Sequence, residues 1–282
     1  LSDDALRTIR DNIIRAAELA ADVGFDFVDI KCCHGYLLHE LLGARTRRGD
    51  YGGSFENRTR LFTEVLEGIR ATRPNLLIGS RVSITDLVPY ERSAIDALGV
   101  PMTKASDLPW KHAFGVAQDD PLRSEYTEPT EFVALCARLG VFMLNLTIGS
   151  PYYCPHLQRP AAYPPSDGYL PPRDPMLEVV RHLKTVRAIK ERCPDMPLVG
   201  SGYSYLQEWL PHVAEFEVAN GHVDMIGLGR SMLSYPTLPT DVLAGNALQR
   251  KLLCRTFSDC TTGPRNGLRS GCYPLDAEYA KR

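Results

Sequence analysis

The chain has 282 residues, of which 44% are hydrophobic and 23% are charged, a composition typical of globular proteins with a substantial core. Its 32 basic and 34 acidic residues give a net charge of -2, so no basic excess indicates binding to nucleic acid or to a membrane surface. No apolar run approaches the roughly 18 residues of a membrane-spanning helix, and the first residues lack a secretory signal pattern. Eight cysteines in this length do not suggest a disulfide framework, and we expect a reduced protein in the cytoplasm.

Helices and strands are predicted to alternate along the chain. The first helix is predicted to begin at the N-cap Ser2, because acidic residues follow it and apolar residues then recur at helical spacing until Gly24. Four more helices are predicted at 58–72, 129–139, 174–192 and 205–219. Stretches typical of strands cover 25–31, 76–83, 141–147, 197–200 and 223–228. This alternation is typical of parallel βαβ units.

Two connections are unusually long, at 84–128 and 148–173, and the second is rich in proline and tyrosine. Loops of this length often serve as binding loops or lids. Each follows a predicted strand, so we expect both at the end of the sheet where parallel α/β proteins place their chemistry.

Proton-exchanging side chains follow the first predicted strand directly. Lys31 closes the strand, and His34 and Tyr36 come next, where reacting groups are expected in a parallel α/β protein. Successive strand residues face opposite sides of a sheet, so Lys31 and His34 can converge only if the chain bends. Gly35 makes such a bend feasible.

Two runs on either side of a short gap carry a family resemblance. His34-Gly35-Tyr36-Leu37 is followed by Tyr51-Gly52-Gly53-Ser54-Phe55-Glu56-Asn57-Arg58. Together they resemble the strand-4 segment of the Old Yellow Enzyme family, the NADH:flavin oxidoreductases that include the 2,4-dienoyl-CoA reductase branch. The glycine-rich loop is interpreted as structural, and Glu56 and Arg58 are expected to hold it in place by ion pairs.

The resemblance implies an α/β fold of the (β/α)8 TIM-barrel class. Residues 1–250 would form a partial FMN-binding barrel that covers about strands 4 to 8, and residues 251–282 a cysteine-containing C-terminal extension packed on it. Five strands cannot close such a barrel, so we expect roughly three more β/α units, of ~30 residues or more each, ahead of Leu1. The chain alone would have unpaired edge strands, and we expect it to be poorly stable or to form a homo-oligomer.

The resemblance also implies catalytic roles. In the family, two donors hold the carbonyl oxygen of an unsaturated substrate over the flavin, and a tyrosine supplies a proton. The matching positions are Lys31 and His34 as carbonyl ligands and Tyr36 as general acid. Negative charge builds on that oxygen as hydride adds to the substrate, and preorganised donors stabilise it. Lys31 stands where the family usually has a histidine. An ammonium differs from an imidazole in being a hydrated point charge on a longer stem.

A cofactor site is predicted at the later strand ends. Arg81 lies near the end of the second predicted strand, where the family places an arginine beside the pyrimidine edge of the flavin. Ser201 and Gly202 end the fourth strand, and Gly229 and Arg230 end the fifth. Glycines at two successive strand ends let backbone N–H groups approach a phosphate, and an arginine can pair with it. Many barrels share this phosphate site, so it also fits an aldolase or an isomerase.

Three cysteines near the C-terminus, Cys254, Cys260 and Cys272, have the spacing C-x5-C-x11-C. The iron–sulfur members of the family use C-x2-C-x2-C-x11-C, and Phe257 stands here at the second position. Such clusters ordinarily take four thiolates, so we expect no 4Fe–4S cluster and no other metal site. Zinc would lack an evident fourth ligand.

These expectations describe an FMN-dependent oxidoreductase of the ene-reductase type. It would reduce the C=C bond of a small α,β-unsaturated carbonyl substrate, with NADH or NADPH as the source of electrons. Two alternatives stay open. One is a phosphate-binding TIM-barrel enzyme without flavin, and the other is an inactive fragment of a flavin oxidoreductase.

Overall fold

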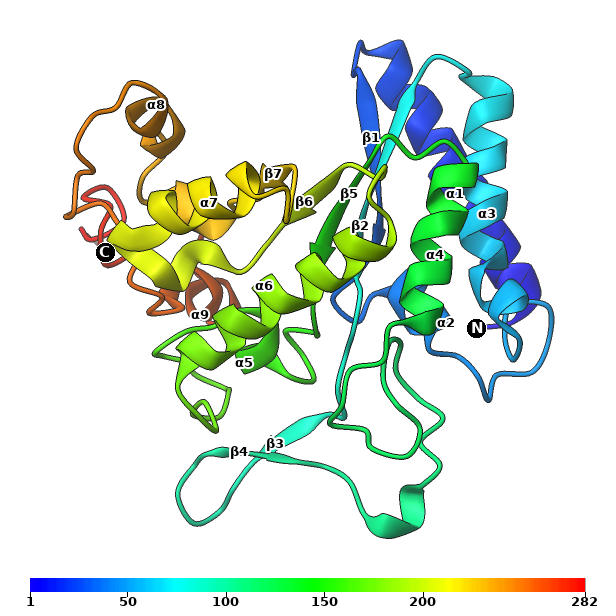
Figure 1. Ribbon diagram of the computed structural model, residues 1–282, viewed down its shortest axis with the longest axis horizontal. Helices are drawn as coiled ribbons and strands as arrows, with labels where there is room; N and C mark the ends of the chain where they lie inside the picture. The colour runs from blue at the N-terminus through cyan, green and yellow to red at the C-terminus, as the bar shows by residue number, and fades with distance from the viewer. Residues whose placement is uncertain (282) are drawn as a thin grey trace.

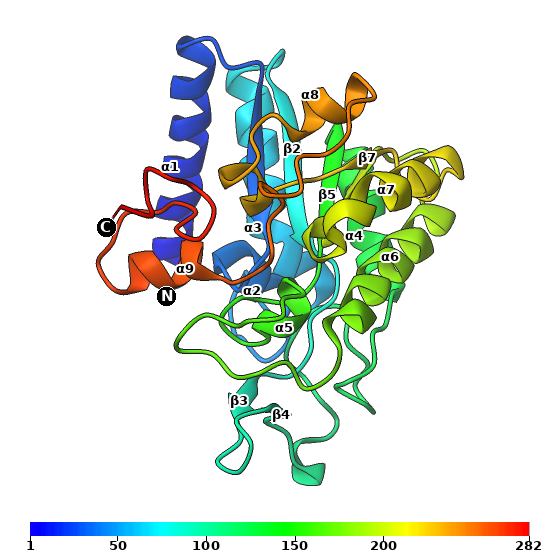
Figure 2. The ribbon, with the colours of Figure 1, turned by 90° about the vertical axis from the view of Figure 1, so that its left-hand side faces the viewer.

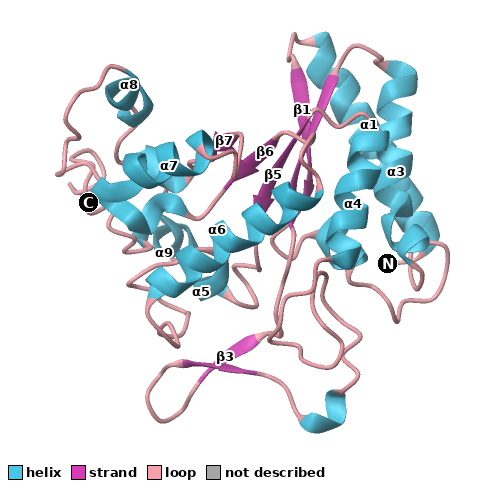
Figure 3. Cartoon of the chain, viewed as in Figure 1, coloured by secondary structure: helices cyan, strands magenta, loops and turns pink. Residues whose placement is uncertain are grey.

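A five-stranded parallel sheet forms the centre of the molecule (Figure 1). In the computed structural model, which describes residues 1–281, the strands lie in the order β1-β2-β5-β6-β7. Their bounds are Phe27–Cys32, Leu77–Ser83, Met143–Thr147, Leu198–Gly200 and Met225–Ile226. All five predicted strands are present, and the order of strands in the sheet follows their order in the chain. Figure 3 shows that the strands run side by side and point the same way.

The predicted helices are present as well. They are α1 (Asp3–Asp22), α3 (Phe55–Thr72), α4 (Thr127–Arg138), α6 (Pro175–Arg192) and α7 (Leu210–Ala219). Contacts join α1 to β1, α6 to β6 and α7 to β7, as expected for helices that cover a parallel sheet. Within residues 1–281, no helix combines the length and apolar character needed to span a bilayer.

Side-chain caps explain why three of these helices begin where they do. The hydroxyl of Ser2 accepts a hydrogen bond from the backbone N–H of Ala5, and Ser54 caps α3 in the same way. Asp174 caps α6, and Pro175 follows it at the first helical position. The seventh helix differs from its prediction, because 203–209 is a 3₁₀ segment in which Gln207 has a φ of 49°. This left-handed residue breaks the helix, and α7 begins only at Leu210.

Both long connections contain short elements of their own. The first holds an antiparallel hairpin of β3 (Tyr90–Arg92) and β4 (Gly99–Pro101) and a 3₁₀ turn at Ala105–Asp107. The second holds α5 (Pro155–Gln158). The hairpin projects beyond the carboxyl ends of the sheet strands, as Figure 2 also shows from the side. Both connections therefore lie at the end of the sheet where they were expected.

The glycine-rich loop before α3 is held mainly by Arg58. This side chain is 3% exposed; its Nε donates to the carbonyl of Gly53 at 3.0 Å, and its guanidinium pairs with Glu128. Glu56 does not take the role that was expected of it. Its side chain is exposed and reaches only Arg60, one turn further along α3, at 3.7 Å.

The sheet is an open arc in the part of the chain that the structure describes. No strand there pairs with the outer edge of β1 or of β7. Beside β1 lies a pocket of about 340 Å3 against α1, with apolar lining that includes Ile13, Ala16, Phe25 and Phe27. An unpaired edge next to apolar side chains can pair with another chain.

Candidate active site

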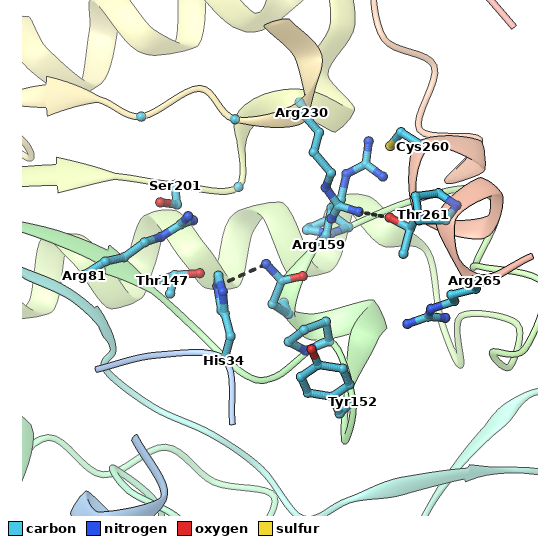
Figure 4. A pocket seen from close by; sticks show the side chains of 18 residues that line it. His34, Arg81, Thr147, Tyr152, Arg159, Ser201, Arg230, Cys260, Thr261 and Arg265 are labelled. Carbon is cyan, nitrogen blue, oxygen red and sulfur yellow. Dashed lines mark hydrogen bonds between the residues drawn. The ribbon is translucent and has the colours of Figure 1, made fainter. Parts of the chain in front are cut away.

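A pocket of about 470 Å3 opens at the carboxyl ends of the sheet strands (Figure 4). Its size lies within the ~300–1,000 Å3 of ordinary small-molecule sites. Six of the eight residues predicted for catalysis or cofactor binding line it: His34, Arg81, Ser201, Gly202, Gly229 and Arg230. Lys31 and Tyr36 lie outside this lining.

The predicted bend after β1 is present and places His34 in the pocket. His34 and Gly35 both have left-handed backbone angles, with φ of 65° and 70°. The N–H of His34 donates to the hydroxyl of Ser83 at 3.0 Å, and the N–H of Gly35 donates to Nδ1 of His39 at 2.9 Å. A side chain at position 35 would also meet Ser150, whose Oγ would lie 2.7 Å from its Cβ. Glycine is therefore required at this point of the bend.

His34 is held as a neutral imidazole. Burial, together with the nearby charges of Arg81 and Lys31, lowers the pKa of His34 from 6.5 to about 3. The side-chain amide nitrogen of Gln158 lies 3.2 Å from Nε2 of His34. An NH2 group can only donate, so this contact leaves the ring proton on Nδ1. A neutral histidine in this state can donate one hydrogen bond to a ligand.

The ends of β5 and β6 form one wall of the pocket. The hydroxyl of Ser201 donates to the side-chain oxygen of Asn145 at 2.9 Å. Gly202 has a φ of 96° and packs on the ring of His182, which a Cβ would approach to 2.6 Å. A glycine therefore lets the chain turn here directly over α6.

The lining of the pocket is strongly basic. The pocket lining contains four arginines, Arg81, Arg159, Arg230 and Arg265, and no Asp or Glu side chain. Figure 4 shows Arg159 and Arg230 close together, with Arg81 across the pocket beside Thr147 and Ser201. Burial and the neighbouring charge of Arg159 lower the pKa of Arg230 to about 10. An anion bound here would relieve this repulsion.

Several buried polar atoms of the lining also lack partners among the described residues. They are Nε of Arg81, Oγ1 of Thr147 and Nη1 of Arg159. Buried polar atoms normally have hydrogen-bond partners, and exceptions at a pocket wall point to a ligand. Because two of the three atoms belong to guanidinium groups, which only donate, that ligand must carry acceptor oxygens or nitrogens. The phosphate, ribityl chain and ring carbonyls of FMN meet this requirement.

The C-terminal segment completes the pocket. Arg230 donates to the hydroxyl of Thr261, which lies in α9 (Asp259–Arg265), and Arg265 of the same helix pairs with Asp167. The hydroxyl of Ser258 donates to the carbonyl of Tyr163 at 2.7 Å. This segment therefore packs on the second long connection and on the strand-end arginine.

The three C-terminal cysteines lie in this same segment. Cys254 accepts a hydrogen bond from Nη2 of Arg159 at 3.3 Å, and Cys260 lines the pocket. Residues 1–281 contain no group of three or more side chains arranged to hold a metal ion. The expectation of no iron–sulfur cluster stays a prediction.

Lys31 and Tyr36 form a second group just outside the pocket. The hydroxyls of Tyr36 and Tyr152 lie 2.7 Å apart, and Tyr152 lines the pocket. The ammonium of Lys31 lies 3.4 Å from the ring centroid of Tyr36. The structure thus brings Lys31 to Tyr36, while His34 bonds to Gln158 inside the pocket. The roles of Lys31 and His34 as carbonyl ligands remain predictions.

Sequence reasoning missed several residues of the pocket: Thr147, Tyr152, Gln158, Arg159, Thr261 and Arg265. Five of them lie in the second long connection or the C-terminal segment, where the sequence shows no strand or helix periodicity that fixes their direction. The proline- and tyrosine-rich composition of that connection was the available signal. It indicated a binding loop but could not show which side chains turn inward.

The sequence of the chain is similar to flavin oxidoreductases. Residues 1–114 match the sequence model of the NADH:flavin oxidoreductase / NADH oxidase family. The NADH-dependent flavin oxidoreductase iliE of Hypocrea jecorina (strain QM6a) is 25% identical over 241 residues, which cover 84% of this chain and 49% of that protein. The 12-oxophytodienoate reductase 1 of Oryza sativa subsp. japonica is 40% identical over 85 residues, which cover 29% of this chain and 22% of that protein. These matches span half or less of each relative.

Solved structures share the fold. A 2-naphthoyl-CoA reductase complex superposes with a TM-score of 0.67 at 18% identity, covering 100% of this chain and 35% of that chain. Morphinone reductase in complex with tetrahydroNAD superposes with a TM-score of 0.54 at 19% identity, covering 88% of this chain and 52% of that chain. At these identities the likeness concerns the fold alone.

The fold is therefore that of an α/β protein with a parallel sheet, of the TIM-barrel class, of which this chain forms a partial barrel. In sequence, the chain is similar to flavin oxidoreductases of the Old Yellow Enzyme type. The resemblance drawn from the run after β1 and the glycine-rich loop is therefore confirmed.

Proposed function

We propose that this chain carries the FMN- and substrate-binding part of an oxidoreductase that reduces the C=C bond of an α,β-unsaturated carbonyl compound with NADH or NADPH. The observation that carries the proposal is one pocket with two chemically different regions. One region is an arginine-rich anion site at the ends of the last strands, and the other holds the neutral His34 at the end of β1. A cofactor with a phosphate tail and a reactive ring needs both.

The arginine-rich region fits the phosphate of FMN. Arg159 and Arg230 with the hydroxyl of Thr261 would hold the phosphate, and the backbone of Gly202 and Gly229 lets it approach closely. Arg81 and Ser201 across the pocket would hold the rest of the molecule, with the Arg81 charge opposing negative charge on the ring. When bound, FMN would supply the redox chemistry, and the protein supplies orientation and charge.

The residues after β1 would act on the substrate. His34, neutral at physiological pH, would donate a hydrogen bond to the carbonyl oxygen and stabilise the negative charge that develops there. Tyr36 would supply the proton. Lys31 could serve as the second carbonyl donor only by leaving the Tyr36 ring, on which its ammonium now lies.

We place the protein in the cytoplasm on chemical grounds. All eight cysteines are free thiols, which suits a reducing compartment. The partner proposed for the pocket is a small molecule, since the net charge of -2 gives no reason to expect nucleic acid.

A visible spectrum of the purified protein with added FMN tests the function. Bound FMN should show shifted yellow absorption bands, bleach when NADH or NADPH is added without oxygen, and regain its colour with 2-cyclohexenone. Binding without bleaching would favour the inactive fragment. Absence of FMN binding, with retention of inorganic phosphate, would favour the phosphate-binding barrel without flavin.

A further inference from the structure

We propose that Tyr152 is a second proton-transfer residue of this site, placed between the pocket and Tyr36. In this arrangement Tyr152 gives its hydroxyl proton to the substrate, and Tyr36 restores it. The inference rests on the proposed function, and it assigns a catalytic role to a residue of the second long connection.

The geometry of the two tyrosines supports a shared proton. Their hydroxyl oxygens are 2.7 Å apart, the usual distance of a strong O–H···O hydrogen bond. Their rings meet edge to face, with centroids 5.8 Å apart. Tyr152 lines the pocket and Tyr36 does not, so a proton from Tyr36 reaches the pocket through the Tyr152 hydroxyl.

Backbone contacts fix the positions of Tyr36 and Tyr152 relative to each other. The N–H of Tyr152 donates to the hydroxyl of Ser150 at 3.2 Å. Ser150 is fully buried and packs directly against Gly35, the residue before Tyr36. The turn after β1 and the connection after β5 therefore meet at Ser150, and each presents its tyrosine from that contact. Such preorganisation favours proton transfer, which needs donor and acceptor in place.

Lys31 explains how the pair could tolerate loss of a proton. After Tyr36 has passed its proton to Tyr152, negative charge remains on the Tyr36 ring and oxygen. The ammonium of Lys31, 3.4 Å from the ring centroid, attracts the electron-rich ring and would attract the phenolate more strongly. Lys31 is then a positioning and charge-balancing residue that acts through Tyr36.

The proton balance closes with water. The substrate gains hydride at its β-carbon, which the proposed cofactor supplies, and one proton at its α-carbon. That proton comes from the O–H of Tyr152, whose oxygen takes the proton of Tyr36. Tyr36 is 46% exposed and recovers its proton from solvent, so both tyrosines end as they began.

Tyr152 is protonated when it is needed. The hydrogen bond with Tyr36, followed by a weak desolvation of the largely exposed side chain, raises the pKa of Tyr152 above the usual value of 10, against a smaller opposing effect of Lys31. A phenol in this state is a donor at neutral pH.

Stopped-flow kinetics of the full chain with FMN separate this role from binding. Tyr152→Phe should slow reoxidation by 2-cyclohexenone on the order of 10²-fold, the usual contribution of a general acid, and leave reduction of the flavin by NADH unchanged. The double variant Tyr36→Phe/Tyr152→Phe should be no slower than Tyr152→Phe alone, because the two residues act in series. Tyr163→Phe is the matched control: Tyr163 is an exposed tyrosine of the same connection, and its ring packs at a tilt against Phe257.

A second readout needs no cofactor. In protein labelled with ¹³C at the tyrosine Cζ, the pH titration of the Tyr152 signal should move to lower pH in Tyr36→Phe, because the hydrogen bond that raises its pKa is lost. Lys31→Met should move it to higher pH, and Tyr163→Phe should leave it in place.

The outcomes distinguish the two proposals. A chain that binds no FMN overturns the proposed function and the relay with it. A chain that turns over while Tyr152→Phe reoxidises at the wild-type rate overturns the relay alone, since the proton must then reach the substrate without passing through Tyr152, from Tyr36 or from water. A Tyr152 titration that Tyr36→Phe leaves unchanged also overturns the relay, because the two hydroxyls would not share a proton.

Discussion

Individual side chains of the pocket show which kind of ligand it suits. Arg230 is partly buried beside Arg159, and both the desolvation and this neighbour lower its pKa to about 10. No acidic side chain of the lining offsets these charges. A site that holds two guanidinium groups together without a carboxylate is more stable with a bound anion, since the anion replaces repulsion by attraction.

Loss of either guanidinium should therefore weaken FMN binding. A hydrogen bond to a charged group contributes about 1.5–3 kcal/mol, so Arg159→Ala and Arg230→Ala should each raise the Kd for FMN by roughly 10- to 100-fold. Equilibrium dialysis measures this change, and inorganic phosphate should compete with FMN in the wild type. Arg92→Ala, an exposed arginine of β3, serves as the control. If all three variants bind FMN with the affinity of the wild type, the anion site must lie elsewhere.

At the scale of the elements, the sequence predicts helices and strands well where local periodicity and capping residues determine them. Ser2, Ser54 and Asp174 begin their helices as residues of these types should. The helix expected at 205–219 begins late, because the positive φ of Gln207 interrupts it, and local propensity does not predict such a backbone angle. The direction of Tyr152 and Arg159 likewise depends on how the second long connection folds back over the strand ends. No local pattern encodes such contacts.

The turn after β6 requires glycine for two reasons, and they can be separated. Gly202 has a φ of 96°, and a Cβ there would also lie 2.6 Å from the ring of His182. Gly221 has a φ of 67° with nothing near its Cβ position, so Gly221→Ala measures the backbone strain alone, about 1 kcal/mol. Gly202→Ala should lower the free energy of unfolding by roughly 2–4 kcal/mol, because it adds a clash in the core. Equal losses for the two variants in urea denaturation would show that the ring of His182 moves aside freely.

His182 of α6 should make stability depend on pH. Burial lowers the pKa of His182 to about 4 in the folded protein, whereas an unfolded histidine titrates near 6.5. Between these values the unfolded state binds more protons, so the free energy of unfolding should fall as the pH falls from 6.5 to 4, by up to ~1.4 kcal/mol per pH unit. His182→Gln, which can still donate to the carbonyl of Leu157, should reduce this slope, and His112→Gln at an exposed position should not. Denaturation curves at several pH values give the slopes directly, and identical slopes for His182→Gln and the wild type would contradict the assignment.

For the molecule as a whole, the open arc of the sheet is the feature from which we predict the state of association. The arc places His34 and Arg230, nearly two hundred positions apart in the sequence, in one pocket. Its cost is the outer edge of β1, which has no partner strand within residues 1–281. The apolar pocket between β1 and α1 lies beside that edge. Apolar side chains next to unpaired backbone groups favour contact with a second chain.

Self-association of this chain should therefore depend on that edge. Phe25 is 63% exposed and lines the pocket beside β1, so Phe25→Lys should add charge where two copies meet without disturbing the core. We expect this variant to shift sedimentation equilibrium toward the monomer, while its urea midpoint stays close to that of the wild type. Leu243→Lys is the control, since Leu243 is 89% exposed in α8 (Leu238–Leu243), away from β1 (Figure 1). If Leu243→Lys shifts the chain toward the monomer and Phe25→Lys does not, the contact between copies forms at a surface other than the edge of β1.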